Sequence, residues 1–154
     1  MTRMIVASAV LVSVAACGGI GGSGSGSVCA TSDDCGGDVC ARTHECYPAD
    51  EVRRVMTRWT LNAAPASAAQ CTTDGIDHLS IVYQDSSTGE QVGYAPVPCG
   101  QGQFLVDVWP TRFDLVQLEA VAPGQGTIAI GANNVGRTGD VDTTIDLAIP
   151  ALTP

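Results

Sequence analysis

Val141-Asp142-Thr143-Thr144-Ile145-Asp146-Leu147-Ala148-Ile149 is the stretch that decides the fold of this chain. Every second position from Val141 onward holds an apolar or β-branched residue, and the positions between hold acidic, hydroxylated or small residues. Successive side chains of a β-strand point to opposite faces, so this alternation is typical of a half-buried strand. The stretch therefore predicts a strand with one face in a core and the other in water.

The same period-two pattern recurs upstream, between turns rich in Gly, Pro, Asp and Ser. A single helical turn is expected within 64–70, and no longer helical pattern is found. Short strands at regular spacing, punctuated by such turns, favour an antiparallel β-sandwich. We therefore predict an all-β fold in which 51–154 forms a sandwich of about seven strands, near 55–61, 79–83, 92–99, 104–109, 113–121, 127–132 and 141–149.

Three bulky aromatic residues are expected in the sandwich core, namely Trp59, Phe104 and Phe113. Simple alternation along 104–109 places Trp109 on the face opposite Phe104. An exposed Trp109 beside a proline turn would suit contact with carbohydrate or protein, whereas packing between sheets is the commoner environment of a tryptophan. We expect Trp109 to pack.

The start of the chain has the features of an export signal over 1–16. Arg3 precedes an uncharged run that is rich in Val, Ala, Leu and Ile. This run is shorter than the roughly 20 residues that span a bilayer, and it fits the apolar segment of a signal peptide. The residues Val14-Ala15-Ala16-Cys17 resemble the lipobox of bacterial lipoproteins, which implies lipidation of Cys17 and cleavage before it. Plain secretion is the alternative.

A tract composed almost wholly of Gly and Ser follows, and we assign 17–27 to the lipidated cysteine and a flexible linker. By resemblance to the Gram-negative sorting rule, Gly18 rather than Asp after the cysteine permits the outer membrane. The expected location is the cell envelope, lipid-anchored, and the outer membrane if the source is Gram-negative.

The chain has seven cysteines, an odd number that normally leaves one thiol unpaired. Lipidation of Cys17 would restore even parity, and disulfides persist in exported proteins. We therefore expect every other cysteine to be in a disulfide, namely Cys29, Cys35, Cys40, Cys46, Cys71 and Cys99.

The first four of these fall in a Gly- and Asp-rich segment, which we assign to a small disulfide-held module over 28–50. Four cysteines allow three pairings. We favour Cys29–Cys40 with Cys35–Cys46, and the other pairings stay open. A zinc site is the rival interpretation, but the wide spacing and export favour disulfides and no bound metal.

Cys71 and Cys99 flank a predicted hairpin whose turn lies near Gly89, so they are expected to pair. The Cys-rich segment resembles small modules found behind Gly/Ser linkers in exported proteins. The stretch 76–121 resembles transthyretin-like or carboxypeptidase-regulatory-like sandwich modules, on Gly102, Phe104 and 110–113. That resemblance implies a scaffold or binding module with no shared catalytic residues.

Charge excludes some partners. After removal of 1–16, six Arg and sixteen Asp/Glu remain, so the formal charge is 6 − 16 = −10, and the chain has no Lys. Binding to a nucleic-acid backbone or to anionic lipid needs clustered cations, so neither partner is expected.

No set of residues reads as a catalytic site. His44 lies inside the Cys-rich segment, and His78 follows Asp77 on a predicted strand, on the face opposite Leu79. Asp140 and Asp142 lie in and after a loop, where solvated carboxylates are the usual finding. We expect no enzyme activity and no cofactor.

The sequence thus predicts an exported lipoprotein that is anchored through Cys17 and acts as a non-catalytic binding or interaction module for an envelope protein or glycan. The alternative is a structural or accessory subunit of an envelope assembly, with no ligand of its own.

The parity of the cysteines makes a direct prediction. Alkylation and intact-mass measurement of the mature protein without reductant should find no free thiol among the six cysteines that follow Cys17. Bound zinc with reactive thiols between Cys29 and Cys46 would contradict it.

Overall fold

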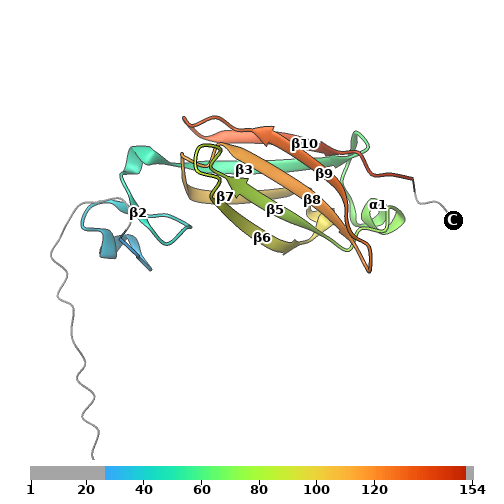
Figure 1. The fold of residues 1–154 in the computed structure, drawn as a ribbon, viewed down its shortest axis with the longest axis horizontal. Coiled ribbons are helices and arrows are strands. Elements are labelled where there is room, and N and C mark those ends of the chain that lie inside the picture. The colour runs from blue at the N-terminus through green and yellow to red at the C-terminus, as the bar shows by residue number, and fades with distance from the viewer. Residues whose placement is uncertain (1–26, 152–154) are drawn as a thin grey trace, which may run out of the picture.

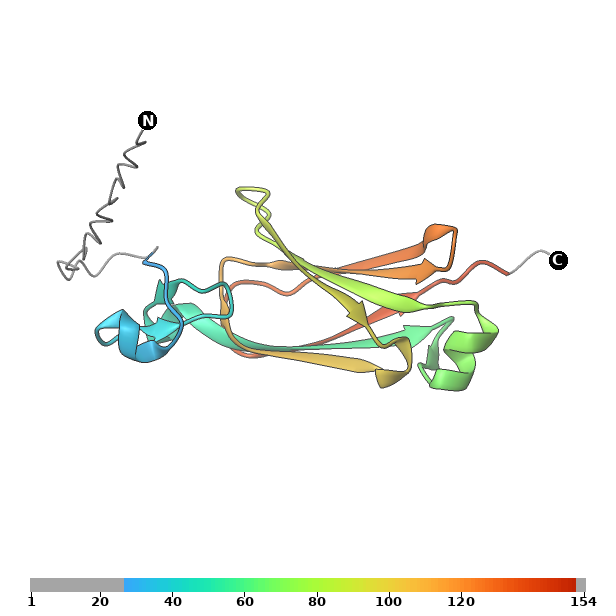
Figure 2. The same ribbon diagram turned by 90° about the horizontal axis from the view of Figure 1, so that it is seen from below.

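The computed structural model describes residues 27–151, which form a small N-terminal module beside a two-layered β-sandwich (Figure 1). The predicted signal peptide, the lipobox with Cys17 and nearly all of the linker lie outside the described residues. The module lies at one end of the sandwich, and the C-terminal end of the described chain lies at the other (Figures 1 and 2).

One layer is built around β3 (Val52–Leu61), the first long strand of the chain. It pairs with β7 (Gln103–Pro110) in antiparallel fashion on one side and with β10 (Val141–Leu147) in parallel on the other. The two-residue strand β4 (Ala64–Pro65) pairs with the end of β3. The stretch that alternates most cleanly in the sequence therefore lies along the first sandwich strand.

The other layer has the order β6-β5-β8-β9 and is antiparallel throughout. Its strands are β5 (His78–Gln84), β6 (Gln91–Val97), β8 (Leu115–Ala122) and β9 (Gly126–Asn134). The β5–β6 hairpin turns at Gly89, whose φ of 77° favours glycine. β6 lies at a sheet edge, where Pro96 is tolerated because an edge strand leaves some backbone positions without a partner strand.

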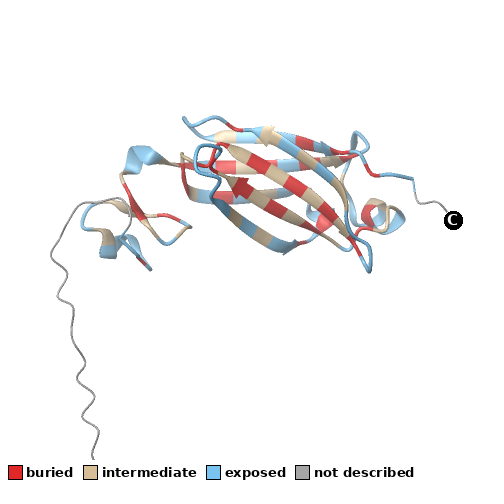
Figure 3. Ribbon diagram, viewed as in Figure 1, coloured by how far each residue is buried: buried red, intermediate tan, exposed pale blue. Residues whose placement is uncertain are grey.

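The predicted fold class is confirmed: the protein is all-β, with seven long strands in two sheets over residues 52–147 and a disulfide-rich segment before them. Alternate residues of β3, β5 and β8 are buried between the sheets, as Figure 3 shows by its striped colouring. The alternate residues on one face of β3 and of β5 are all buried, namely Val55, Thr57, Trp59, Leu61, Leu79, Ile81 and Tyr83.

The N-terminal module has little regular structure. It contains the 3-10 helix η1 (Ser32–Cys35), the two-residue strands β1 (Val39–Cys40) and β2 (Cys46–Tyr47), and the 3-10 helix η2 (Ala49–Glu51) that leads into β3. Disulfides Cys29–Cys40 and Cys35–Cys46 hold it, which is the favoured pairing. Because a module of this size buries little apolar area, it depends on covalent links for its stability.

The third disulfide, Cys71–Cys99, lies at the opposite end of the molecule and is also as predicted. It joins α1 (Ala68–Thr73) to the 3-10 helix η3 (Cys99–Gln101). Both half-cystines are buried in the main core. The predicted helical turn is therefore present, a few residues later than expected.

A β-bulge corrects one prediction. Trp109 was expected on the face opposite Phe104, yet it is fully buried among the core aromatic residues. The three steps of β7 from Val106 to Trp109 match two steps of β3, from Val55 to Arg53, and Val108 has a φ of 48°. The extra residue inverts the alternation, so Trp109 points inward like Val106. The expectation that Trp109 packs between the sheets is confirmed.

The sandwich is closed along one side by a close approach of β9 to β10. A Cβ atom built on Gly131 would lie 2.5 Å from Ile145 Cγ2 and 3.1 Å from the carbonyl oxygen of Asp146. Asn133 Nδ2 donates across the same gap to the carbonyl oxygen of Thr144 at 2.8 Å. The absence of a side chain at Gly131 therefore allows this contact.

Substitution of Gly131 by Ala should destabilise the fold by about 1–3 kcal/mol, because the added methyl forces β9 away from β10. Gly93→Ala is the matched control, since the nearest atom to its added Cβ would be 3.8 Å away. Chemical denaturation of the two variants measures the difference. Equal stability of both variants would contradict this account of the closed side.

Candidate interaction surfaces

The six cysteines within residues 27–151 all form disulfides. Cys29, Cys35 and Cys40 lie close enough together to suggest a metal site, but each of these sulfur atoms belongs to a disulfide. A disulfide sulfur has no thiolate to offer a metal. The zinc interpretation of the module is therefore not supported.

The two histidines lie on different parts of the molecule. His78 is on β5, on the face opposite Leu79 as predicted, and its Nδ1 lies 2.8 Å from Asp77 Oδ2. His44 lies in a turn of the module, with a φ of 63°. The structure does not bring the two together into one site.

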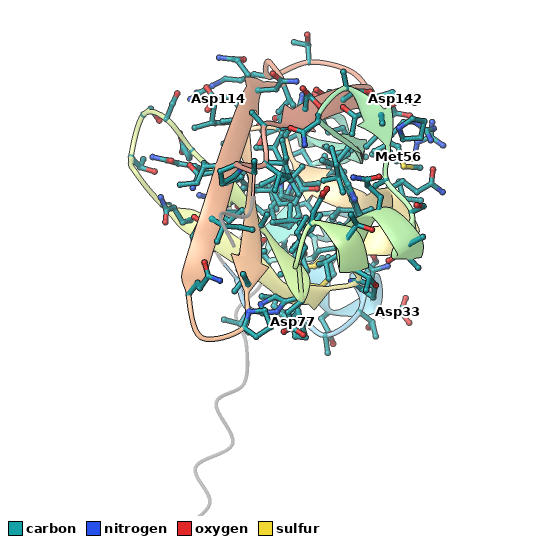
Figure 4. The ribbon with its side chains drawn as sticks, turned by 90° about the vertical axis from the view of Figure 1, so that its right-hand side faces the viewer. Asp33, Met56, Asp77, Asp114 and Asp142 are labelled. Atoms are coloured by element: carbon teal, nitrogen blue, oxygen red, sulfur yellow. A yellow bond between two sulfur atoms is a disulfide. The ribbon has the colours of Figure 1, made fainter. Side chains whose placement is uncertain are left out.

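The outer face of the β10-β3-β7 sheet is charged. Arg58 forms an ion pair of 3.1 Å with Asp142, and Arg54 lies 3.7 Å from Asp140. Asp146 accepts a hydrogen bond from Thr60 Oγ1 at 2.7 Å. Figure 4 looks along the sandwich and shows Met56 and Asp142 on this flank. The acids predicted to be solvated turn carboxylates are thus exposed and paired with arginines across the sheet.

The outer face of the β6-β5-β8-β9 sheet is nearly uncharged. The burial pattern and register place fifteen residues of these strands on the outer face, and only His78 and Glu119 among them can carry a charge. Glu119 accepts hydrogen bonds from Gln117 and Thr127 on the same face. We call these fifteen residues the neutral face: His78, Ser80, Val82, Gln84, Gln91, Gly93, Ala95, Leu115, Gln117, Glu119, Val121, Thr127, Ile130, Ala132 and Asn134.

The aromatic side chains are buried or half-buried. All seven aromatic residues of the chain lie within the described range, and none is exposed. Tyr83, Trp109 and Phe113 are fully buried and pack in a row with tilted rings, whose centroids are 4.8 and 5.0 Å apart. Burial raises the pKa of Tyr83 to about 12, and its hydroxyl shares a hydrogen bond with Thr57 inside the core.

Arg112 connects the module to the sandwich. Its guanidinium donates to Glu45 and to the Tyr47 hydroxyl of the module, and to Glu90 of the β5–β6 hairpin. It also lies over the ring of Phe113, 4.5 Å from the centroid. Hydrogen bonds from Tyr47 and then from Arg112 lower the pKa of Glu45. Three segments that are distant in the sequence are therefore joined at one cation.

A second polar cluster closes the same end of the sandwich. Asp85 and Asp114 are both buried, and Arg137 donates to each of them, at 3.1 and 2.9 Å. Burial alone would raise the pKa of Asp114, but hydrogen bonds from Ser86 and Arg137 outweigh it and lower this pKa to about 2. The cluster fixes the loops that follow β5, β7 and β9.

Buried Arg53 holds two of these loops, those that follow β7 and β9, through hydrogen bonds to their backbone. Its guanidinium donates to the carbonyl oxygens of Phe113, Val135 and Gly136 at 2.8–3.2 Å. Desolvation lowers its pKa, and within residues 27–151 its Nε has no hydrogen-bond partner. Neither polar cluster leaves a charged group free in a recess to act on a substrate.

The described surface has two recesses worth noting. One, of about 310 Å³, lies between the module and β7 and includes Arg42, His44 and Val108. The other, of about 400 Å³, lies beside the end of α1 and includes Ile76 and Asp77. Neither gathers a nucleophile, a base and an orienting group, as nucleophilic catalysis requires.

No family model, curated protein or solved structure matches the chain. Between residues 27 and 151, no helix is long and apolar enough to cross a membrane.

The sequence did not indicate the neutral face or the clusters around Arg112 and Asp114. The face could have been found by counting charges on the outward positions of each predicted strand, once the strands were assigned to sheets. The clusters join residues that are 22 to 67 positions apart in the sequence, so no pattern among neighbouring residues could have predicted them.

The low pKa of Asp114 predicts acid sensitivity. A carboxylate whose pKa falls from about 3.9 in the unfolded chain to about 2 in the folded protein stabilises the fold above about pH 4. That stabilisation is lost as the pH falls through about 2. Asp114→Asn should cost about 1–3 kcal/mol at pH 7. Its melting temperature should fall less steeply than that of the parent between pH 4 and 2. Parallel melting curves for parent and variant would contradict the assignment.

Proposed function

We propose that this chain is an exported lipoprotein, tethered to the cell envelope through Cys17, whose sandwich is a non-catalytic module that binds protein. The tether rests on the lipobox and on the odd number of cysteines. The three disulfides support it, because they account for every cysteine except Cys17 and suit an oxidising compartment.

The observation that carries the binding role is the neutral face. The chain has 16 acidic residues, yet the outward positions of four neighbouring strands include a single carboxylate, Glu119. Depletion of charge is the compositional signature of the central part of protein interfaces. Ile130, with 60% of its surface exposed, is the most prominent hydrophobic side chain on this face.

The aromatic residues favour protein over glycan as the partner. Recognition of sugar rings commonly uses the exposed face of an aromatic side chain, and none of the seven aromatic residues is exposed. The resemblance to transthyretin-like modules agrees with a scaffold role.

Substitution of Cys17 by Ser tests the tether. The variant should incorporate no radiolabelled fatty acid and should accumulate as an unprocessed precursor. Ser13→Ala is the matched control in the same leader, because it leaves the lipobox intact. Acylation and processing of the Cys17→Ser variant like the parent would refute the anchor.

A further inference from the structure

The partner that best fits the neutral face is a second copy of this chain. We propose that tethered copies pair face to face through this surface, about a two-fold axis that runs along the strands. The inference deepens the proposed function and rests on its membrane tether. Three features of the described residues support it: the distribution of charge, the distribution of side-chain size, and the position of the module.

Charge favours the neutral face for self-association. The mature chain carries 6 − 16 = −10 formal charges, so two copies repel one another at most approaches. The module displays Asp33, Asp34 and Asp38, and the β10-β3-β7 sheet displays Asp107, Asp142 and Asp146. When two neutral faces meet, Glu119 and His78 of each copy are the only ionisable side chains among the fifteen residues that enter the interface.

Side-chain size makes the face self-complementary. Towards β8 and β9 its middle carries Gln117, Glu119 and Ile130, with Ala132 as the one small residue, whereas towards β5 and β6 it carries Ser80, Val82, Gly93 and Ala95. A two-fold axis parallel to the strands sets β9 of one copy over β6 of the other. The larger half of each face then covers the smaller half of its partner, as an isologous interface requires.

The same axis keeps both tethers at one end. The module, which follows the linker, lies at the end of the sandwich where β3 begins (Figures 1 and 2). Rotation about an axis along the strands leaves the two modules side by side at that end. Both copies can therefore be anchored in one membrane. An axis across the strands would place the modules at opposite ends.

The size of the face predicts a weak dimer. Four strands about 4.8 Å apart and some seven residues long, at about 3.3 Å per residue, give roughly 450 Å². A stable interface buries about 800 Å² on each partner. Confinement to a membrane raises the local concentration of the copies, so pairing is expected mainly for the tethered protein.

Photo-cross-linking of the acylated protein in phosphatidylethanolamine/phosphatidylglycerol vesicles tests this inference. A photoreactive residue in place of exposed Ala132 should give a covalent dimer, linked to residues 80–95 of the other copy. A chain that begins at residue 17 and carries Cys17→Ser, and so has neither the leader nor a lipid, should give at least tenfold less at the same bulk concentration. Linkage to the β10-β3-β7 sheet, or no dimer in vesicles, would overturn the proposal.

A pair of matched variants identifies the face. Ile130→Asp should reduce the cross-linked dimer about tenfold, whereas Leu105→Asp, which alters the 48% exposed hydrophobic residue on the other sheet, should leave it unchanged. Equal effects of the two substitutions would overturn the proposal. Flotation of the same vesicles reports the tether separately: bound but monomeric protein refutes only the second-copy inference, and failure of the acylated protein to float refutes the proposed anchor. Cross-linking in cells to a different envelope protein instead would replace the second copy and keep the binding role.

Discussion

The burial of Trp109 between the two sheets is the constraint on which the rest of the structure depends. Its ring lies 4.8 Å from Tyr83 and 5.0 Å from Phe113, so it joins β5, β7 and the β7–β8 turn in one aromatic cluster. The bulge at Val108 is what turns it inward, at the cost of a positive φ for a β-branched residue. Burial of so large a ring offsets that strain.

The same bulge determines where the module sits. The carbonyl oxygen of Val108 accepts a hydrogen bond from the Arg42 amide, and the neighbouring Asp107 pairs with the Arg42 guanidinium. A few residues further on, Arg112 lies over Phe113 and bonds to Glu45 and Tyr47. The contacts of the core and those of the module thus meet on one short segment, and the module covers part of the free edge of β7 there.

The strands could be predicted because their signal is local. Alternation in β3, β5 and β10 and the turn at Gly89 each depend on a few neighbouring residues. The inverted orientation of Trp109 could not be predicted, because it depends on one extra residue relative to a partner strand some 50 positions earlier. Nor could the parallel pairing of β3 with β10, since alternation specifies which face a strand buries and not which neighbour it takes. The candidate surface depends on both facts, because outward positions form a face only after strands are assigned to sheets.

The outer faces of the two sheets differ in charge because only one of them carries arginines. Six arginines follow the predicted signal peptide, and all six are engaged within the described residues: Arg42, Arg54, Arg58, Arg112 and Arg137 with carboxylates, and Arg53 with carbonyl oxygens. Arg54 and Arg58 lie on the outer face of the β10-β3-β7 sheet, and Arg112 and Arg137 lie at the module end of the sandwich, where acidic residues accompany them. The β6-β5-β8-β9 face has no arginine with which to offset carboxylates, and in a Lys-free chain it carries almost no carboxylates either. The neutrality of this face therefore follows from the placement of the arginines. It leaves one broad surface of an acidic protein that a second acidic molecule can approach with little electrostatic repulsion.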